Sequence, residues 1–214
     1  MESKRQLYLM ISKTDTSTGR IIRAVSHYRY NHVSLTLDPT LRTWVSFGRF
    51  YQDIPFYGGF IQESVERYLS KGYDVKVRIF RLDIPEEKYR QLQYLFSQTG
   101  QPECGLIYNF FDALASTFRH KVQIDGAYTC LSFACTVLGK RHFTIKSLNE
   151  DLKPYLIYDG PLSALTPDTG SREDTYFVRH SFLHGSWATT KQFADLFTRV
   201  FRHYHRDIVA QQLT

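Results

Sequence analysis

Residues 32 to 49 restrict the fold of this chain more than any other stretch. The segment "HVSLTLD" (32–38) alternates strictly, so that Val33, Leu35 and Leu37 share one face and polar side chains share the other. A turn-forming "DPTLR" follows, and "TWVSFGR" (43–49) has the composition of a returning strand. The stretch therefore predicts an antiparallel hairpin with one buried face.

The remaining periodicities indicate a mixture of strands and helices. Strands are expected over residues 6–12 and 73–83, and helices over residues 20–28, 85–100, 109–118, 129–139 and 189–210. Gly139 is expected to cap the helix that it follows, and "FYQDIPFYGGF" (50–60) is typical of a loop. Together these segments predict an α+β fold, with an antiparallel sheet of about four to six strands packed against helices.

The composition fits a folded protein of this class. The chain has 214 residues, of which 43% are hydrophobic and 22% are charged. This is enough apolar material for a full core, and the charge is ordinary for a globular protein, so bulk disorder is excluded. Residues 159–174 are rich in Pro, Gly, Ser and acidic residues, and we expect a linker or long loop there, before a final helix.

The net charge of +6 suits an anionic partner, but the basic residues are scattered along the chain. The densest cluster is "RVFRHYHR" at residues 199–206, and two interpretations of it stay open. It could make peripheral contact with an anionic surface such as a membrane, or it could be the solvated face of a C-terminal helix. Since no nucleic-acid-binding motif accompanies it, we expect no nucleic-acid partner.

The sequence favours a cytoplasmic location. The apolar stretch near the N-terminus has only about five residues, too few for a signal peptide, and no segment approaches the roughly 20 apolar residues of a transmembrane helix. The three cysteines are an odd number, which argues against a disulfide framework in a reducing compartment. We therefore expect free thiols and no transmembrane segment.

Cys130 stands where a predicted helix begins. "IDGAYT" before it is polar and turn-prone, whereas "CLSFACTVL" (130–138) is apolar and helix-compatible. A cysteine in a first helical turn lies among unpaired N–H groups at the positive end of the dipole, which favour a thiolate and could bind an oxyanion. Cys135 is expected to be inert packing and Cys104 to be incidental. For Cys130 itself, a nucleophile and a packing residue both stay open.

His32 opens the alternating strand on its polar face, as a base that reaches from a sheet toward a thiol would. The alternative, a solvated residue at the edge of a sheet, stays open. His180 and His184 have a spacing that could seat a metal ion, but no cysteine or carboxylate pattern completes such a site. We therefore expect no metal and no cofactor.

In their order along the chain, these motifs resemble those of the circularly permuted papain-like cysteine hydrolases. This superfamily includes relatives of the NlpC-type cell-wall peptidases and the lecithin retinol acyltransferase-like proteins. Its members are similar to this chain in a histidine that heads a strand like "HVSLTLD", a later tyrosine-led helix like "YNFFDAL", and a cysteine that opens a helix, as in "YTCLSFACTVL". Papain has its cysteine before its histidine, and the permuted members reverse that order, as this chain does. The resemblance covers about residues 5–160.

The resemblance implies a thiol active site. Cys130 would be the nucleophile, and His32 would be the general base and later the general acid. Tyr108 or Tyr128 would line the side on which the oxyanion forms. The implied fold is permuted papain-like, and the implied chemistry needs no cofactor.

A third polar group normally orients the histidine, and the resemblance places it on the neighbouring strand. Ser46 occupies the matching face if the second strand of the hairpin alternates from Trp44. Glu63, which we expect to be a loop carboxylate, could serve instead, or it could be an N-terminal charge of a helix. The choice between Ser46, Glu63 and no third group stays open.

Two functions are therefore expected. The first is a cysteine hydrolase, of amidase or peptidase type, that acts on a peptide, an amide or an acyl lipid, with acyl transfer as a variant of the same chemistry. The second is a catalytically weak or inactive protein that binds a lipid or peptide on the same scaffold. In both, residues 1–160 form the papain-like domain, and residues 161–214 form a loop and a C-terminal helical extension packed on it.

Overall fold

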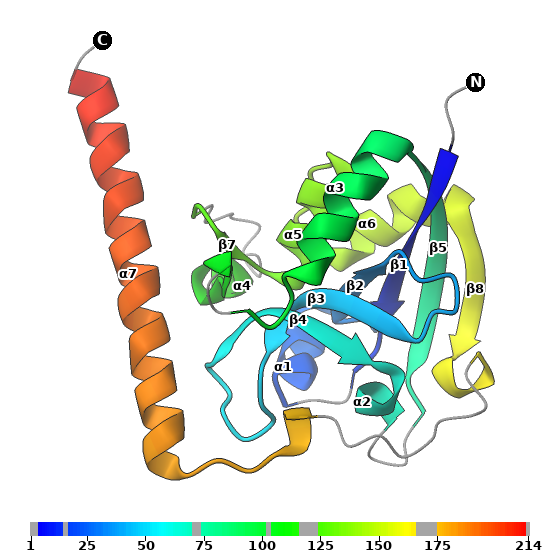
Figure 1. Ribbon diagram of the computed structural model, residues 1–214, viewed down its shortest axis with the longest axis horizontal. Coiled ribbons are helices and arrows are strands. Elements are labelled where there is room, and N and C mark those ends of the chain that lie inside the picture. The colour runs from blue at the N-terminus through cyan, green and yellow to red at the C-terminus, as the bar shows by residue number, and fades with distance from the viewer. Residues whose placement is uncertain are drawn as a thin grey trace.

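The structure is a computed structural model that describes residues 4–14, 17–69, 74–101, 104–115, 124–165 and 175–212. Within these residues, eight strands form one twisted sheet (Figure 1) in the order β7-β6-β4-β3-β2-β1-β5-β8. The strands are β1 (Lys4–Ser12), β2 (His32–Thr36), β3 (Thr43–Arg49), β4 (Gly58–Ser64), β5 (Lys76–Pro85), β6 (Ile107–Tyr108), β7 (Ala127–Tyr128) and β8 (Leu156–Pro161).

The observed sheet confirms the α+β class and corrects its details. It is larger than the expected four to six strands, and it is mixed, because β6 and β7 run parallel while the other described pairs are antiparallel. Strands β6 and β7 have two residues each, too few to show any alternation in the sequence. Strand β8 ends at Pro161, so it includes the start of the expected 159–174 loop. Residues 166–174 of that loop lie outside the described residues.

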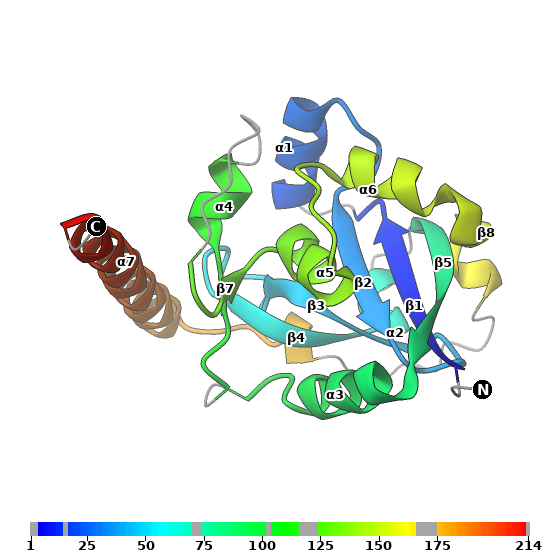
Figure 2. The same ribbon diagram turned by 90° about the horizontal axis from the view of Figure 1, so that it is seen from above.

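Helices cover both faces of the sheet. Side chains of α3, α5 and α6 pack on one face, and those of α2 and the turn η4 pack on the other. Seen from above, α5 lies over the middle of the sheet between α3 and α6 (Figure 2). The helices and short 3₁₀ turns are α1 (Ser17–Ser26), α2 (Val65–Leu69), α3 (Glu86–Ser97), α4 (Phe110–Ala115), α5 (Cys130–Leu138), α6 (Ile145–Leu152), η3 (Lys153–Tyr155), η4 (Leu162–Ala164), η5 (Thr175–Phe177) and α7 (Phe182–Gln212).

Alternation along the strands produces the two cores. On β1, Leu7 and Leu9 belong to the cluster under α3, α5 and α6, whereas Met10 belongs to the cluster on the opposite face. On β2, Val33 and Leu35 are buried in the first cluster. The hairpin of β2 and β3 therefore has the buried face expected from its sequence, although the opposite face is largely buried as well.

The segment expected to be a loop contains the start of β4. Its two glycines, Gly58 and Gly59, stand where the backbones come very close, since a Cβ atom added at Gly58 would lie 2.4 Å from the carbonyl oxygen of Gly48. Glycine is required there by the approach of two strands and not by a turn. The glycine pair therefore suggests a loop in the sequence, although in the structure it belongs to a strand. Glu63, which was expected in a loop, lies on β4.

The helix that carries Cys130 has a defined end. Gly139 follows α5 in the left-handed conformation, with φ of 64°, and its N–H donates to the carbonyl oxygens of the last turn. The predicted C-cap is thus confirmed, and the residue type is explained by the positive φ. The end of α5 is consequently set by the sequence itself.

The C-terminal helix α7 lies along one side of the molecule (Figure 1). Leu196 is fully buried against Ile124 and Ala127, and the side-chain oxygen of Gln192 accepts the N–H of Gly58 at 2.9 Å. This helix begins seven residues before the expected start at residue 189. Across the described ranges, the structure contains no helix with both the length and the continuous apolar sequence of a membrane span.

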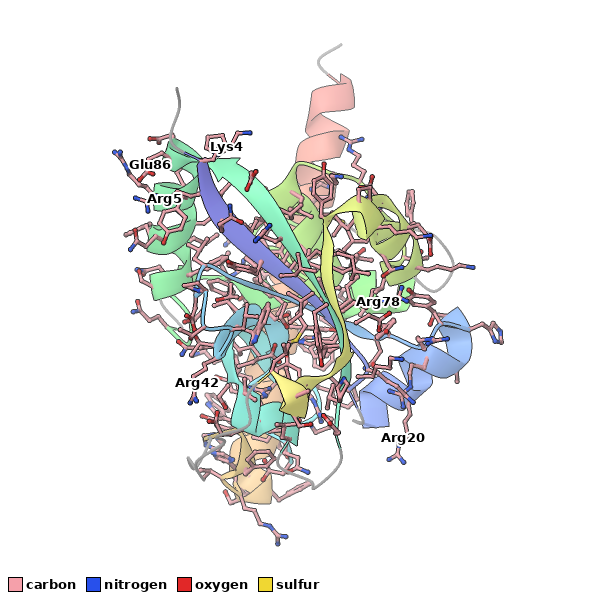
Figure 3. All side chains as sticks on the ribbon, turned by 90° about the vertical axis from the view of Figure 1, so that its right-hand side faces the viewer. Lys4, Arg5, Arg20, Arg42, Arg78 and Glu86 are labelled. Carbon is pink, nitrogen blue, oxygen red and sulfur yellow. The ribbon has the colours of Figure 1, made fainter. Side chains whose placement is uncertain are left out.

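Basic side chains do not gather into one patch on the side of the molecule shown in Figure 3. They range from Lys4 and Arg5 at the start of β1 to Arg20 on α1. Several belong to local ion pairs: Arg5 lies 2.6 Å from Glu86, and Arg78 lies 2.8 Å from Asp159 on the neighbouring strand. This agrees with the scattered charge seen in the sequence.

Replacing Gly139 by alanine should destabilise the fold without touching the site. No atom lies within 4 Å of an added Cβ, so the cost is that of a side chain in the left-handed region, about 1 kcal/mol. The Gly139→Asn variant is the matched control and should lose less, because asparagine tolerates this conformation. Urea denaturation measures both, and an equal loss in the two variants would contradict the explanation.

Candidate active site

Cys130 is the first residue of α5, and the preceding residue holds the end of the helix in place. Thr129 Oγ1 accepts the N–H of Ser132 at 3.0 Å, while Ser132 Oγ accepts the N–H of Thr129 at 2.8 Å. This capping box leaves Cys130 in the first turn, where helix geometry provides no acceptor for its N–H. The half-buried thiol therefore lies at the positive end of the helix dipole.

The imidazole of His32 joins this thiol to a carboxylate. His32 is the first residue of β2, is nearly buried, and lies close enough to the Cys130 side chain for the sulfur to favour its charged form. Its Nε2 lies 2.9 and 3.1 Å from the two carboxylate oxygens of Glu63. Since Nε2 is engaged by Glu63, the ring nitrogen left for the sulfur is Nδ1. The three side chains thus form a Cys–His–Glu line from a helix end across the sheet.

Glu63 is buried, and several donors surround it. Its Oε2 accepts hydrogen bonds from Ser34 Oγ at 2.9 Å and from Tyr68 Oη at 2.7 Å, in addition to the His32 contact. Arg67, one helical turn further on, places its Nε 4.0 Å from Oε1. A carboxylate without water is stable only when such partners replace its hydration. These donors therefore keep Glu63 ionised.

Burial and neighbouring charges have opposite effects on the pKa values of His32 and Glu63. Burial disfavours the imidazolium, but the Glu63 carboxylate and the Cys130 sulfur outweigh it and raise the pKa of His32 to about 10. Burial also disfavours the carboxylate, but His32, Arg67 and Tyr68 outweigh it and lower the pKa of Glu63 to about 2. The stability due to His32 is present below pH 6.5 and is lost as the pH rises through about 10, and that due to Glu63 is lost as the pH falls from 4.5 toward 2.

Of the two candidates for the third group, the structure brings Glu63 to His32. The hydroxyl of Ser46 is fully buried and donates to the carbonyl oxygen of Val33 at 2.6 Å, so its one proton is engaged by the backbone of β2. The neighbouring strand β3 therefore provides no orienting group at position 46. The carboxylate comes from the next strand, β4. The register of β3 and β4 pairs Trp44 with Glu63, so Glu63 lies on the same face of the sheet as Trp44.

Tyr108 and Tyr128 lie side by side, but they face different surroundings. Strands β6 and β7 pair in parallel at these two residues. Burial, the Cys130 sulfur and Asp112 raise the pKa of Tyr108 well above its ordinary value, so its hydroxyl keeps its proton. The Tyr128 ring instead packs 5.3 Å from the ring of Phe47 in the core. Tyr108 is therefore the better placed of the two to donate to an oxyanion.

A residue from the C-terminal part of the chain reaches the same network. The Arg67 guanidinium lies 3.8 Å from the centre of the Tyr176 ring, and Tyr176 Oη accepts a hydrogen bond from Arg49 at 2.7 Å. Arg67 also donates to the carbonyl oxygen of Arg49 at 2.6 Å. The guanidinium of Arg67 is thus held between the end of β3 and η5.

Sequence reasoning missed three groups around the carboxylate, namely Ser34, Arg67 and Tyr68. A signal existed for Ser34, because it is two residues after His32 on the alternating strand and so shares its face. For Arg67 and Tyr68 the signal is the segment "ESVERY" (63–68). Arg67 and Tyr68 follow Glu63 by four and five residues, which is about one helical turn. Its use requires knowing that Glu63 is buried.

The other cysteines and the histidine pair take no part in this arrangement. Cys135 is buried, and Cys104 is half-buried in a turn. The rings of His180 and His184 stack with centroids 5.0 Å apart, and the backbone N–H of His180 donates to Asp53 at 2.6 Å. Among the residues that the structure describes, no group of three or more His, Cys, Asp or Glu side chains could hold a metal ion.

Comparisons with known proteins add no further constraint on the site. No protein-family model, no curated protein and no solved structure matches this chain.

The titration of His32 should depend on Glu63. In the wild-type protein the ring should stay protonated to about pH 10, whereas in Glu63→Gln the pKa of His32 should fall well below 10, because only the Cys130 sulfur then opposes burial. Two-dimensional ¹H–¹⁵N NMR of the imidazole nitrogens follows this directly. The ring of His142, whose partner Asp151 is untouched, is the internal control. Titration of His32 near pH 6.5 in both proteins would contradict the ion pair.

Proposed function

We propose that this chain is a cysteine hydrolase with Cys130 as nucleophile, His32 as general base and acid, and Glu63 as the residue that orients His32. The observation that supports this most is the position of one imidazole between a thiol at a helix start and a buried carboxylate. A nucleophile, a base and an orienting group within hydrogen-bonding reach are the parts that thiol hydrolysis requires.

The first half of the proposed reaction forms an acyl-enzyme. The Cys130 thiolate bonds to a carbonyl carbon, and the carbonyl oxygen takes up the electron pair as an oxyanion. The backbone N–H of Cys130 and the hydroxyl of Tyr108 are the proposed donors to that oxyanion. When the intermediate collapses, the bond to the leaving amine or alcohol breaks, and the leaving group takes a proton from the His32 imidazolium.

The second half releases the acid. Neutral His32 takes a proton from water, and the resulting hydroxide bonds to the acyl carbon. The carbon–sulfur bond then breaks, which restores the Cys130 thiolate and the His32 imidazolium. If an alcohol or amine replaces water, the same steps transfer the acyl group, so hydrolase and acyltransferase share this site.

The proposed substrate class follows from the sequence resemblance to permuted papain-like hydrolases. It is a peptide, another amide or an acyl lipid, and no cofactor takes part. In this proposal residues 1–160 are the catalytic domain, residues 161–214 are an extension packed on it, and the protein works in the cytoplasm, where its thiol stays reduced. The alternative is a binding protein on the same scaffold with an inert thiol.

Thiol labelling distinguishes the two functions. At pH 6 an ordinary thiol is almost wholly protonated, so an activated Cys130 should react with iodoacetamide at least about tenfold faster than Cys104. Cys104 is a matched control because it is also half-buried. His32→Ala should bring the two rates together. Peptide mass spectrometry measures both sites in one sample, and equal rates in the wild-type protein would favour the binding protein.

An activated ester tests the acyl-enzyme itself. With p-nitrophenyl acetate, the wild-type protein should release a burst of about one p-nitrophenolate per chain and gain one acetyl group on Cys130 by intact mass. Cys130→Ala should show neither, and His32→Ala should slow the burst by about 10²–10⁴-fold. Cys135→Ala is the control and should keep the burst. A burst that survives Cys130→Ala would overturn the assignment of the nucleophile.

A further inference from the structure

Arg49 is the last residue of β3, and the register of the hairpin places it beside the candidate active site. Strands β2 and β3 are antiparallel and pair Leu35 with Val45. Continued along the two strands, this register sets His32 opposite Gly48, directly before Arg49. The base of the proposed reaction and Arg49 therefore occupy neighbouring positions at the same end of the sheet.

A second alignment runs from Arg49 across the sheet toward the oxyanion side of the site. Arg49 pairs with Gly58 on β4. The pairing of Gly59 with Ile107 on the next strand, β6, sets Gly58 opposite Tyr108. Arg49, Gly58 and Tyr108 thus form one row across the sheet. Because the middle residue of this row is a glycine, no side chain at that position separates the other two.

The same row leads to the candidate nucleophile. Tyr108 pairs with Tyr128, which precedes Cys130 by two residues. Figure 2 shows β3, β4 and β7 next to one another beside α5, the helix that begins with Cys130. The charge of Arg49 acts on the Tyr108 hydroxyl, because it lowers the pKa of Tyr108 while burial and the Cys130 sulfur raise it. A substrate group that extends from Cys130 past Tyr108 would therefore approach Arg49.

The guanidinium of Arg49 is held in place by uncharged acceptors. Its Nη1 donates to the carbonyl oxygen of Gln52 at 3.3 Å, and its Nη2 donates to Tyr176 Oη at 2.7 Å. An arginine side chain has five N–H donors, so within the described residues these two bonds leave three for another acceptor. A fixed, planar cation with donors to spare is well suited to bind a carboxylate.

The carboxylates around the site have other partners. Glu63 is bound by the imidazole of the site at 2.9 Å. Asp112 lies 3.4 Å from Thr129 Oγ1, and Asp53 accepts the backbone N–H of His180 at 2.6 Å. The guanidinium at the end of β3 is therefore suited to an anion that comes from outside the chain.

We infer that Arg49 binds a carboxylate in the acyl part of the substrate, so that the site acts on acyl compounds with a free carboxylate on that side of the scissile bond. The acyl part is indicated because the leaving group takes its proton from His32, whereas Arg49 reaches the site along the row of Tyr108. The inference names the substrate class of the thiol site and so rests on the proposed function. In it, Arg49 determines specificity and takes no part in bond breaking.

Two p-nitrophenyl esters of adipic acid test the inference. One has a free carboxylate at the far end of the acyl chain and the other has a methyl ester there, so the two differ mainly in charge. The wild-type protein should be acylated faster by the charged ester. Arg49→Gln should lower the ratio of the two burst rates at least about tenfold, because a charge-assisted hydrogen bond is lost.

Two further variants separate binding of the carboxylate from other effects. Arg49→Lys keeps the charge and should restore part of the ratio, which loss of a structural contact would not explain. Arg81→Gln is the matched control, because Arg81 is exposed on β5, with β1 and β2 between it and β3. It removes one positive charge from the protein and should leave the ratio unchanged. Circular dichroism should show that all variants fold.

The outcomes distinguish this inference from the proposed function. A ratio that is unchanged in Arg49→Gln, or that falls equally in Arg81→Gln, would overturn the inference and leave the thiol chemistry standing. The absence of a burst with both esters would count against the proposed function instead.

Alkylation of the thiol then tests Arg49 without an acyl-enzyme. Iodoacetate and iodoacetamide are similar in size and differ in charge. The ratio of their rates should fall at Cys130 in Arg49→Gln but stay the same at Cys104, as measured by peptide mass spectrometry. An unchanged ratio at Cys130 would overturn the inference whatever the esters show.

Discussion

The structure depends on keeping one carboxylate charged in a place that water does not reach. Glu63 is buried on a middle strand of the sheet, and its charge is compensated by an imidazolium, two hydroxyls and, further away, a guanidinium. These donors come from β2, which carries His32 and Ser34, and from α2, which carries Arg67 and Tyr68. The order of β2, β3 and β4 therefore determines more than the core, because it determines which side chains can share this charge.

The small side chain of Ser46 has a part in this arrangement although it does not contact His32. Because β3 lies between β2 and β4, a large residue at its centre would separate the imidazole from the carboxylate. Ser46 is small, and its hydroxyl is engaged by the Val33 carbonyl group. A similar restriction holds at Gly48, where an added Cβ would approach Ile61 to 2.9 Å. Small residues on the middle strand allow its neighbours to interact across it.

Sequence reasoning found the parts of the fold with a strong period and missed those set by contacts between distant segments. The alternation from His32 and the helix that opens at Cys130 are local patterns, and the structure has both elements. The last position of the site could not be decided in the same way. Ser46 and Glu63 are equally compatible with local patterns, and only the register of β3 with β4 separates them. Two-residue strands and a glycine pair between strands carry no period at all.

The stacking of Arg67 on Tyr176 has a consequence for how this protein can be shortened. Tyr176 lies beyond the strands and helices that form the sheet domain, yet its ring covers the guanidinium that faces the carboxylate of the site. A chain cut after β8 would retain every candidate catalytic side chain but would expose that guanidinium to solvent. Its attraction for Glu63 would then be screened by water and salt. The C-terminal segment therefore shields the attraction between Arg67 and Glu63 from solvent, and its removal would weaken that attraction without removing any candidate catalytic residue.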